Sequence, residues 1–269
     1  MLYSDAVDFI SMDKIKSHWD AQAKTYLDSP KATFNDIFLM EKEIRLLSQF
    51  IHDGMRVLDC GCGNGYTSLA LAKKKNAEFT GIDFSQAMIH IAQKIYESEN
   101  GRLKGQVRFH VHDLLTPLQH LGTFDVIICK RVLINLVNRE NQLLGLNRLH
   151  RVLKPHGTLL LSEANEDAWR RLNVLRRRFG LEALGKPWYN RYVRNDELYY
   201  FIKDNFTLRK EISFSSTYYF GSRILQPFWL KLFQPNKEPS FSSKINQVFS
   251  YLPAIGDIGI QKVWVLRKK

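Results

Sequence analysis

The stretch Val57-Leu58-Asp59-Cys60-Gly61-Cys62-Gly63-Asn64-Gly65 is a short apolar strand that runs into a loop with glycines at alternate positions. Residues 68–72 then read as a helix, and strand, glycine loop and helix together are typical of a nucleotide-binding α/β fold. Glycine suits such a loop because it tolerates positive φ and lets a ligand touch the backbone. A second apolar strand, 79–83, ends in Asp83, at a spacing that suits a carboxylate binding ribose hydroxyls.

The loop departs from the dinucleotide fingerprint G-x-G-x-x-G, which would require glycine where Tyr66 stands. Asp59 at the strand end would oppose a pyrophosphate but suit an ammonium or sulfonium group. The stretch resembles motif I of the class I S-adenosylmethionine-dependent methyltransferases, hh(D/E)hGxGxG, and the resemblance covers about residues 15–165. It implies S-adenosyl-L-methionine as cofactor and a doubly wound, mostly parallel seven-stranded α/β sheet, with helices on both faces and an antiparallel last strand.

The resemblance continues through a third strand ending at Asp113, a fourth strand 124–130, and the helix and turn 148–157. It assigns cofactor contacts to the glycine loop, the strand ends and an N-terminal helix, at Trp19, Tyr26, Asp59, Gly61, Cys62, Gly63, Gly65, Asp83, Phe84, Met88, His112, Asp113, Leu114 and Lys130. Alternatively, Trp19 and Tyr26 only anchor their helix to the core, and Met88 is ordinary helix core.

The length of 269 residues favours one decorated domain. We expect a helical cap at 1–50, a cofactor-binding core at 54–163 and a basic substrate insertion at 164–195. The last strands should follow at 196–269, with an aromatic insertion at 221–255. No run approaches the roughly 18 apolar residues that a membrane span needs. The acidic N-terminus has no apolar region typical of a secretory signal, which predicts a cytoplasmic protein.

The three cysteines, at 60, 62 and 129, cannot form a paired disulfide framework. Cys60-x-Cys62 has no second ligand pair downstream, so a structural zinc site is unsupported. We interpret the cysteines as packing residues and predict no metal.

The net charge of +12 is unevenly distributed, because eight basic residues and one acid lie between Arg170 and Arg194. Guanidinium matches phosphate and carboxylate oxygens bidentately. We therefore expect acceptor contacts from Arg171, Arg177, Arg178 and Arg191. The alternatives are a solvated helix face, a lid or a dimer surface. The oligomeric state is left open.

The sequence favours methylation of an oxygen or nitrogen on a small anionic acceptor, such as a sugar phosphate, a glycan end or a carboxylated metabolite. RNA is the alternative acceptor, since a basic face also binds phosphates. A non-catalytic binding module is disfavoured because it needs none of Asp59, the three glycines, Asp83 and Asp113 together. The basic and aromatic insertions could also contact an anionic membrane.

Glu163 is the first candidate for a catalytic base, because it directly follows the fifth strand at the edge where active sites gather. It could equally cap the next helix or pair with an arginine. His18 and Tyr189 are further candidates. Asn135 stands where many relatives have a histidine, which weakens any expectation of a base at that position.

Overall fold

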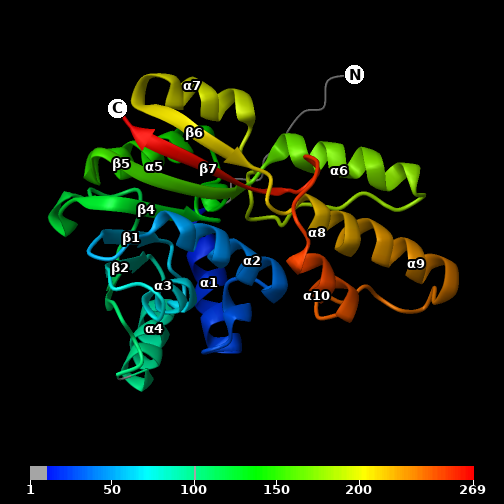
Figure 1. Cartoon of the computed structure of the whole chain (residues 1–269), viewed down its shortest axis with the longest axis horizontal. Coiled ribbons are helices and arrows are strands. Elements are labelled where there is room, and N and C mark those ends of the chain that lie inside the picture. The colour runs from blue at the N-terminus through cyan, green and yellow to red at the C-terminus, as the bar shows by residue number, and fades with distance from the viewer. Residues whose placement is uncertain (1–10, 100) are drawn as a thin grey trace.

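The computed structural model describes residues 11–99 and 101–269, so the first ten residues of the predicted cap lie outside it. Seven strands form one sheet in the order β3-β2-β1-β4-β5-β7-β6 (Figure 1). They are β1 Arg56–Cys60, β2 Glu78–Asp83, β3 Gln106–Val111, β4 Phe124–Lys130, β5 Leu153–Ala164, β6 Phe206–Ile212 and β7 Gln261–Lys268. Among these seven strands β7 alone runs opposite to the other six, which confirms the predicted fold.

The middle of the sheet is built from nearly continuous apolar runs. Val57 and Leu58 of β1 and the residues 159–161 of β5 are fully buried. Such runs are expected where helices cover both faces of a parallel sheet. The strand order reverses between β1 and β4, and doubly wound sheets bind their ligands at the carboxyl ends of the strands at this point.

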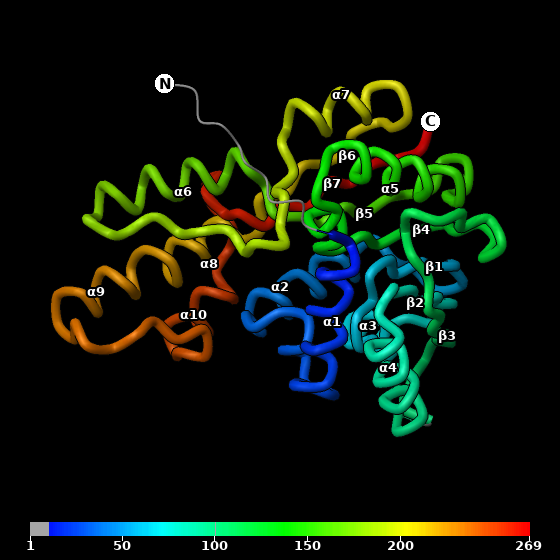
Figure 2. Tube along the Cα trace, turned by 180° about the vertical axis from the view of Figure 1, so that it is seen from behind, coloured from blue at the N-terminus to red at the C-terminus, as the bar shows by residue number. Residues whose placement is uncertain are grey.

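Four of the six helices described in the α/β core, α1, α2, α4 and α5, begin at a residue whose side chain caps them. The hydroxyls of Ser11 and Ser85 accept hydrogen bonds from the backbone N–H three residues ahead and so start α1 and α4. The helices are α1 Met12–Tyr26, α2 Ile37–Leu47, α3 Tyr66–Ala72, α4 Gln86–Ser98, α5 Arg139–Val152 and α7 Asn195–Asn205. α1 lies against α4, and α7 lies against β6 (Figure 2).

Further helices lie in or next to the two segments beyond the core topology, 164–195 and 221–255. They are α6 Glu166–Arg178, α8 Ser216–Phe220, the π-helical turn Gly221–Leu225, α9 Gln226–Phe233 and α10 Lys244–Tyr251. Both views place α6, α9 and α10 together at the end of the molecule away from β3 and α4 (Figures 1 and 2). Within the described residues, no helix is long and apolar enough to cross a membrane.

Candidate functional site

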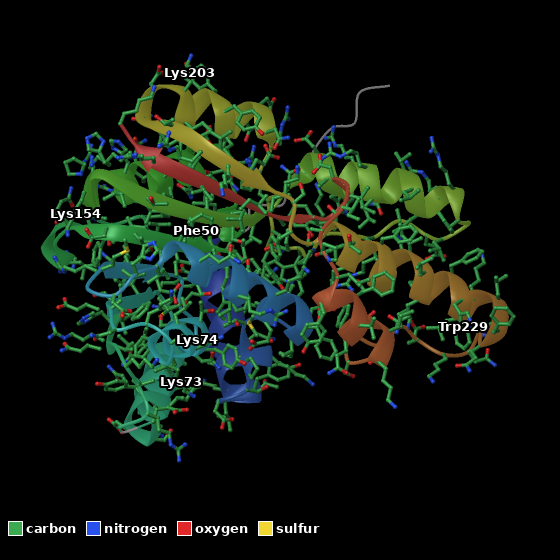
Figure 3. All side chains as sticks on the ribbon, viewed as in Figure 1. Phe50, Lys73, Lys74, Lys154, Lys203 and Trp229 are labelled. Atoms are coloured by element: carbon green, nitrogen blue, oxygen red, sulfur yellow. The ribbon has the colours of Figure 1, made fainter. Side chains whose placement is uncertain are left out.

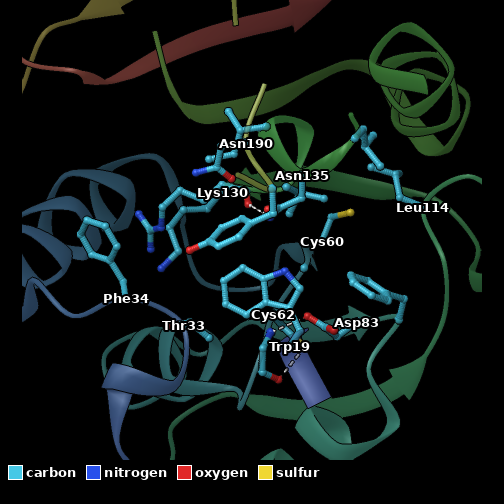
Figure 4. A pocket seen from close by; sticks show the side chains of 18 of the residues that line it. Trp19, Thr33, Phe34, Cys60, Cys62, Asp83, Leu114, Lys130, Asn135 and Asn190 are labelled. Carbon is cyan, nitrogen blue, oxygen red and sulfur yellow. Dashed lines mark hydrogen bonds between the residues drawn. The ribbon is translucent and has the colours of Figure 1, made fainter. Parts of the chain in front are cut away.

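A cavity of about 210 Å³ lies where β1, β2, β4 and β5 end, at the switch point of the sheet. Most of the residues expected at a cofactor site line it: Trp19, Asp59, Gly61, Cys62, Gly63, Asp83, Phe84, Met88, His112, Asp113, Leu114 and Lys130 (Figure 4). Tyr189, a catalytic candidate, also lines it. Tyr26, Gly65, His18 and Glu163 do not line it, nor do the four arginines predicted to hold the acceptor.

The glycine loop bends tightly over the end of β1. Gly61 and Gly63 have φ values of +70° and +55°, which residues that carry a side chain rarely adopt. A Cβ on Gly63 would lie 2.2 Å from Cγ2 of Thr33, so the loop also packs directly under the N-terminal cap. Gly65 begins α3 at φ +78°, and its Cβ would lie 2.6 Å from the ring of Phe109. Gly65 is therefore needed for packing beneath the cavity.

Asp83 joins the glycine loop to the start of α4. Its Oδ2 accepts from the Gly63 N–H at 2.9 Å, and its Oδ1 accepts from the Ser85 N–H at 2.9 Å. Burial raises the pKa of Asp83 to about 6, against the effect of these two backbone donors. A carboxylate offers about four acceptor positions. Asp83 therefore retains acceptor capacity on the cavity side after the loop is held.

Asp59 and Lys130 end the adjacent strands β1 and β4. Asp59 accepts from the Ser68 hydroxyl at 2.6 Å through Oδ2, whereas its Oδ1 is buried without a partner in the described structure. Burial raises the pKa of Asp59, and the charge of Lys130 opposes that shift. Burial lowers the pKa of Lys130 to about 8, and its Nζ donates to the Thr67 hydroxyl. The base of the cavity thus carries both signs of charge.

A carboxylate that the sequence analysis did not identify lies behind these groups. Glu43 of α2 is fully buried, and its Oε2 lies 2.5 Å from Nη1 of Arg131 and 3.9 Å from Nζ of Lys130. The Ser162 hydroxyl donates to its other oxygen. Glu43 therefore ties α2 to the ends of β4 and β5.

Arg131 has a backbone conformation that is costly for a residue with a side chain, at φ +56°. Its guanidinium lies 4.4 Å from the ring centre of Phe34 and is mostly buried at the cavity wall. Strained residues of this kind persist where the surroundings hold them, and they gather at functional sites. The position of Arg131 is therefore a sign of function that the sequence pattern did not give.

Aromatic side chains from α1 and from the loop 179–194 meet over the cavity. The rings of Trp19 and Tyr189 lie 5.6 Å apart, and His18, which does not line the cavity, stacks on Tyr189 with ring centres 4.5 Å apart. Asp20 accepts from the Ser85 hydroxyl and so fixes α1 against α4. The structure thus brings Trp19 and Tyr189 together.

Tyr26 lies elsewhere on α1. It packs with Ala23, Ala32 and Met88 in a small separate cluster and does not reach the cavity. For this residue the structure favours the alternative that it anchors the helix. Met88 belongs to the same cluster and also lines the cavity.

We call the part of the lining that follows β4 in the chain the acceptor half. Its residues are Arg131, Val132, Ile134, Asn135, Leu136, Ala164, Pro187, Tyr189, Asn190, Tyr192, Tyr219, Ile260 and Gln261. Among these lining residues there is no Asp, Glu or His. The side-chain oxygens of Asn135, Asn190 and Gln261 are buried without a partner in the described structure. The acceptor half is therefore aromatic and amide-rich, with a single cation.

The four arginines of the segment 164–195 that the sequence assigns to the acceptor do not line the cavity, which argues against that role. Arg171 pairs with Asp257 at 2.8 Å, and Arg191 donates to both oxygens of Glu197 at 2.8 and 2.9 Å. Arg177 and Arg178 are exposed on α6. The local excess of charge is thus partly neutralised by acids from elsewhere in the chain.

Glu163 is fully buried and faces a loop instead of the cavity. Its Oε1 accepts from the backbone N–H groups of Val132 and Leu133, both at 2.9 Å. Burial raises its pKa to about 8, although these N–H donors oppose the shift. The geometry therefore favours a role in holding the loop after β4, which carries Arg131.

We expect Glu163→Gln to retain turnover within a few-fold and to change the pH dependence of stability. The folded-state pKa of Glu163 lies above its unfolded value, so the protonated side chain contributes stability that is full below about 4.5 and is lost as the pH rises through about 8. Urea unfolding at pH 5 and at pH 8 should show a smaller loss of stability in the variant than in the wild type. A fall in turnover of roughly 10²–10⁴-fold would instead support Glu163 as the base.

Comparisons with known proteins agree with this architecture. A family model described as a methyltransferase domain matches residues 51–205. Ubiquinone biosynthesis O-methyltransferase of Schizosaccharomyces pombe is 31% identical over 158 residues, which are 56% of this chain and 54% of that protein. The match therefore spans about half the length of that relative.

EEF1A lysine methyltransferase 2 of Danio rerio is 30% identical over 162 residues, which are 56% of this chain and 68% of that protein. Among solved structures, magnesium protoporphyrin IX methyltransferase from Synechocystis PCC 6803, with bound SAH, superposes with a TM-score of 0.60. It is 17% identical, and the match covers 96% of this chain and 99% of that one. At this identity the likeness concerns the fold alone.

Proposed function

The chain belongs to the class I S-adenosylmethionine-dependent methyltransferases, and we propose that it methylates an oxygen or nitrogen of a small anionic acceptor. The observation that carries the proposal is the acceptor half of the cavity, with aromatic and amide side chains, one cation, and no carboxylate or imidazole among its described residues. The word O-methyltransferase in the name of the S. pombe relative favours oxygen.

The residues of the other half fit S-adenosyl-L-methionine. The remaining acceptor positions of Asp83 suit the ribose hydroxyls, since Asp83 lines the cavity beside the glycine loop. The unpartnered Oδ1 of Asp59 suits an ammonium or sulfonium group. Trp19, whose Nε1 has no hydrogen-bond partner among the described residues, lines the cavity from α1.

When bound, the cofactor supplies an electrophilic methyl on a sulfonium, so the chain's own residues have to orient the acceptor. Among the described residues of the acceptor half there is no carboxylate or imidazole that could remove a proton from a weakly acidic alcohol. An acceptor that is already ionised at neutral pH, such as a carboxylate or an acidic hydroxyl, avoids this need. Arg131 is the cation in the acceptor half that would attract it, since guanidinium has donors beyond the one that Glu43 accepts.

RNA is the second candidate acceptor, for which the net charge of +12 is the argument. Against it, Arg177 and Arg178 lie outside the cavity lining, and Arg171 is paired with Asp257. A small acceptor therefore agrees better with the placement of the basic side chains.

The direct test is to incubate the purified protein and methyl-labelled cofactor with a metabolite extract and, separately, with total RNA. Mass spectrometry of the labelled products then identifies the acceptor, and treatment with mild base separates methyl esters from ethers and amines. Label in small anionic molecules supports the proposal. Label confined to RNA, or to neutral molecules, contradicts it.

Arg131→Lys tests how the acceptor is held once it is known. The variant keeps the charge beside Glu43 but loses the guanidinium fork, so kcat/KM should fall roughly ten- to a hundredfold, with cofactor affinity unchanged. Arg171→Lys is the matched control outside the cavity and should leave kcat/KM unchanged. Equal effects of the two substitutions would remove Arg131 from acceptor binding.

A further inference from the structure

Exposed apolar side chains gather in the α9–α10 segment. Of the seventeen large apolar residues that are exposed in the described structure, nine lie between Trp229 and Ile255. This region is one end of the molecule, where Trp229 lies at the outer end of the group formed by α6, α9 and α10 (Figure 3). The other eight exposed apolar residues are spread between Leu27 and Leu208 of the described chain, which is ordinary for a protein surface.

Both helices of this segment have a buried face and an exposed apolar face. On α9, Phe228 packs on Phe179, which directly follows α6, with ring centres 5.4 Å apart, whereas Trp229 and Phe233 lie together on the outside with ring centres 5.6 Å apart. On α10 the exposed apolar residues are Ile245, Val248 and Tyr251, spaced three apart. We call the six residues Trp229, Leu232, Phe233, Ile245, Val248 and Tyr251 the apolar patch. They are between 38% and 71% exposed.

Basic side chains accompany the apolar patch. Residues 177–182 and 226–256 contain five lysines and arginines and two glutamates. Arg177 and Arg178 end α6 beside α9, and Lys231 of α9 donates to the Gly180 carbonyl between them. Lys237 and Lys244 are exposed in and after the α9–α10 loop. Arg177 and Arg178, which do not line the cavity, therefore lie at the same end of the molecule as the apolar patch.

We propose that this end of the molecule binds the surface of an anionic lipid bilayer, with the apolar patch entering the headgroup region and Arg177, Arg178, Lys237 and Lys244 contacting the lipid phosphates. Exposed Trp and Phe beside Lys and Arg is the combination that amphipathic surface helices use at membranes. Each basic residue near an anionic surface strengthens binding. A symmetric dimer through this face is disfavoured, because it would bring the same basic residues of two copies together.

The proposal does not depend on the acceptor. It does predict where the cavity lies relative to the bilayer, because the run Ser216–Phe233, which is one continuous series of helical turns, connects the two. It carries Tyr219 of the acceptor half near its start and the exposed Trp229 and Phe233 near its end. A bilayer held by the apolar patch would therefore lie at the far end of the same helical run from the cavity.

Sedimentation of the full chain with sucrose-loaded vesicles tests the proposal. Vesicles of phosphatidylcholine alone are compared with vesicles in which about a quarter of the lipid is phosphatidylglycerol, at low and at high salt. We expect binding to the anionic vesicles at low salt and much weaker binding to the neutral ones. Absence of binding to the anionic vesicles would overturn the proposal.

Two triple variants separate the apolar and electrostatic contributions. Trp229→Ser with Leu232→Ser and Phe233→Ser, and Arg177→Gln with Lys237→Gln and Lys244→Gln, should each lower the partition coefficient by about tenfold or more. The matched control replaces exposed apolar residues at the opposite end, Leu144→Ser, Tyr200→Ser and Leu208→Ser, and should bind as the wild type does. Circular dichroism and calorimetric binding of S-adenosylhomocysteine confirm that each variant is folded.

Equal vesicle binding by the wild type and both triple variants would refute the assignment of this surface. Sedimentation equilibrium without lipid tests whether a second copy of the chain binds the apolar patch instead. A dimer that the apolar triple variant dissociates, with no loss of vesicle binding, would show that the apolar patch is a subunit interface and would overturn the proposal.

Discussion

Asp83→Ala is expected to reduce the affinity for S-adenosylhomocysteine on the order of a hundredfold or more. The ribose loses a charged acceptor for two hydroxyls, and each hydrogen bond to a charged group is worth roughly 1.5–3 kcal/mol. The N–H groups of Gly63 and Ser85 lose their acceptors as well, so the glycine loop loses its attachment to the start of α4. Isothermal titration calorimetry with S-adenosylhomocysteine measures the effect directly.

The pH dependence of the same measurement gives a second check. Burial raises the pKa of Asp83 to about 6, and hydroxyl donors favour the ionised form. The affinity of the wild type should therefore be full well above pH 6 and fall as the pH drops through 6, whereas Asp83→Ala should lack this decline. Asp125→Ala is the control, since Asp125 lies near the amino end of β4, away from the cavity, where it pairs with Lys154. Wild-type affinity in Asp83→Ala would refute the ribose assignment.

The cofactor half of the site could be predicted because its signals are local in the chain. A strand, a glycine loop and a carboxylate on the next strand occupy residues 57–83, and their spacing alone fixes where the loop and Asp83 meet. The seven-stranded, mostly parallel sheet with an antiparallel last strand was expected from the family resemblance that the same stretch carries, and the structure confirms it. The order of the strands was not predicted from the sequence.

Apart from Tyr189, the acceptor half could not be predicted, because its residues meet only in three dimensions. Tyr219 and Gln261 come from separate parts of the last 60 residues, and neither has a sequence neighbour that marks it. The charge of Arg171 and Arg191 was misread for the same reason, since their partners Asp257 and Glu197 were not counted with them. A run of like charges in the sequence therefore predicts a charged surface only when the acidic residues that pair with it are also known.

Glu43 shows the same limit inside the core. It lies in a helix whose apolar spacing predicts packing against the sheet, and no motif marks it. The signal that could have raised the question is a carboxylate on the buried face of an amphipathic helix, because such groups are rarely buried without a partner. Its partners, Lys130 and Arg131, come from a strand end more than eighty residues away.

Glu43→Ala should lower the free energy of unfolding by about 3–5 kcal/mol, the range measured when one partner of a buried ion pair is removed. Arg131 would keep its charge near the protein interior without its carboxylate, and the Ser162 hydroxyl would lose its acceptor. Urea unfolding followed by circular dichroism measures the change. Glu140→Ala on the exposed start of α5 is the control and should stay within about 0.5 kcal/mol of the wild type.

A double substitution decides whether the loss comes from the unpaired charge. Glu43→Leu combined with Arg131→Met removes both charges and keeps apolar volume, so the double variant should be more stable than Glu43→Leu alone. The recovery should be incomplete, because Lys130 remains 3.9 Å from the vacated carboxylate position and the chain still has to adopt φ +56° at residue 131. If the two substitutions simply add, the pairing of Glu43 with Arg131 is not what stabilises the end of β4. The cavity wall would then depend on apolar packing of α2 alone, and the strain at residue 131 would have to be held by the loop that Glu163 binds.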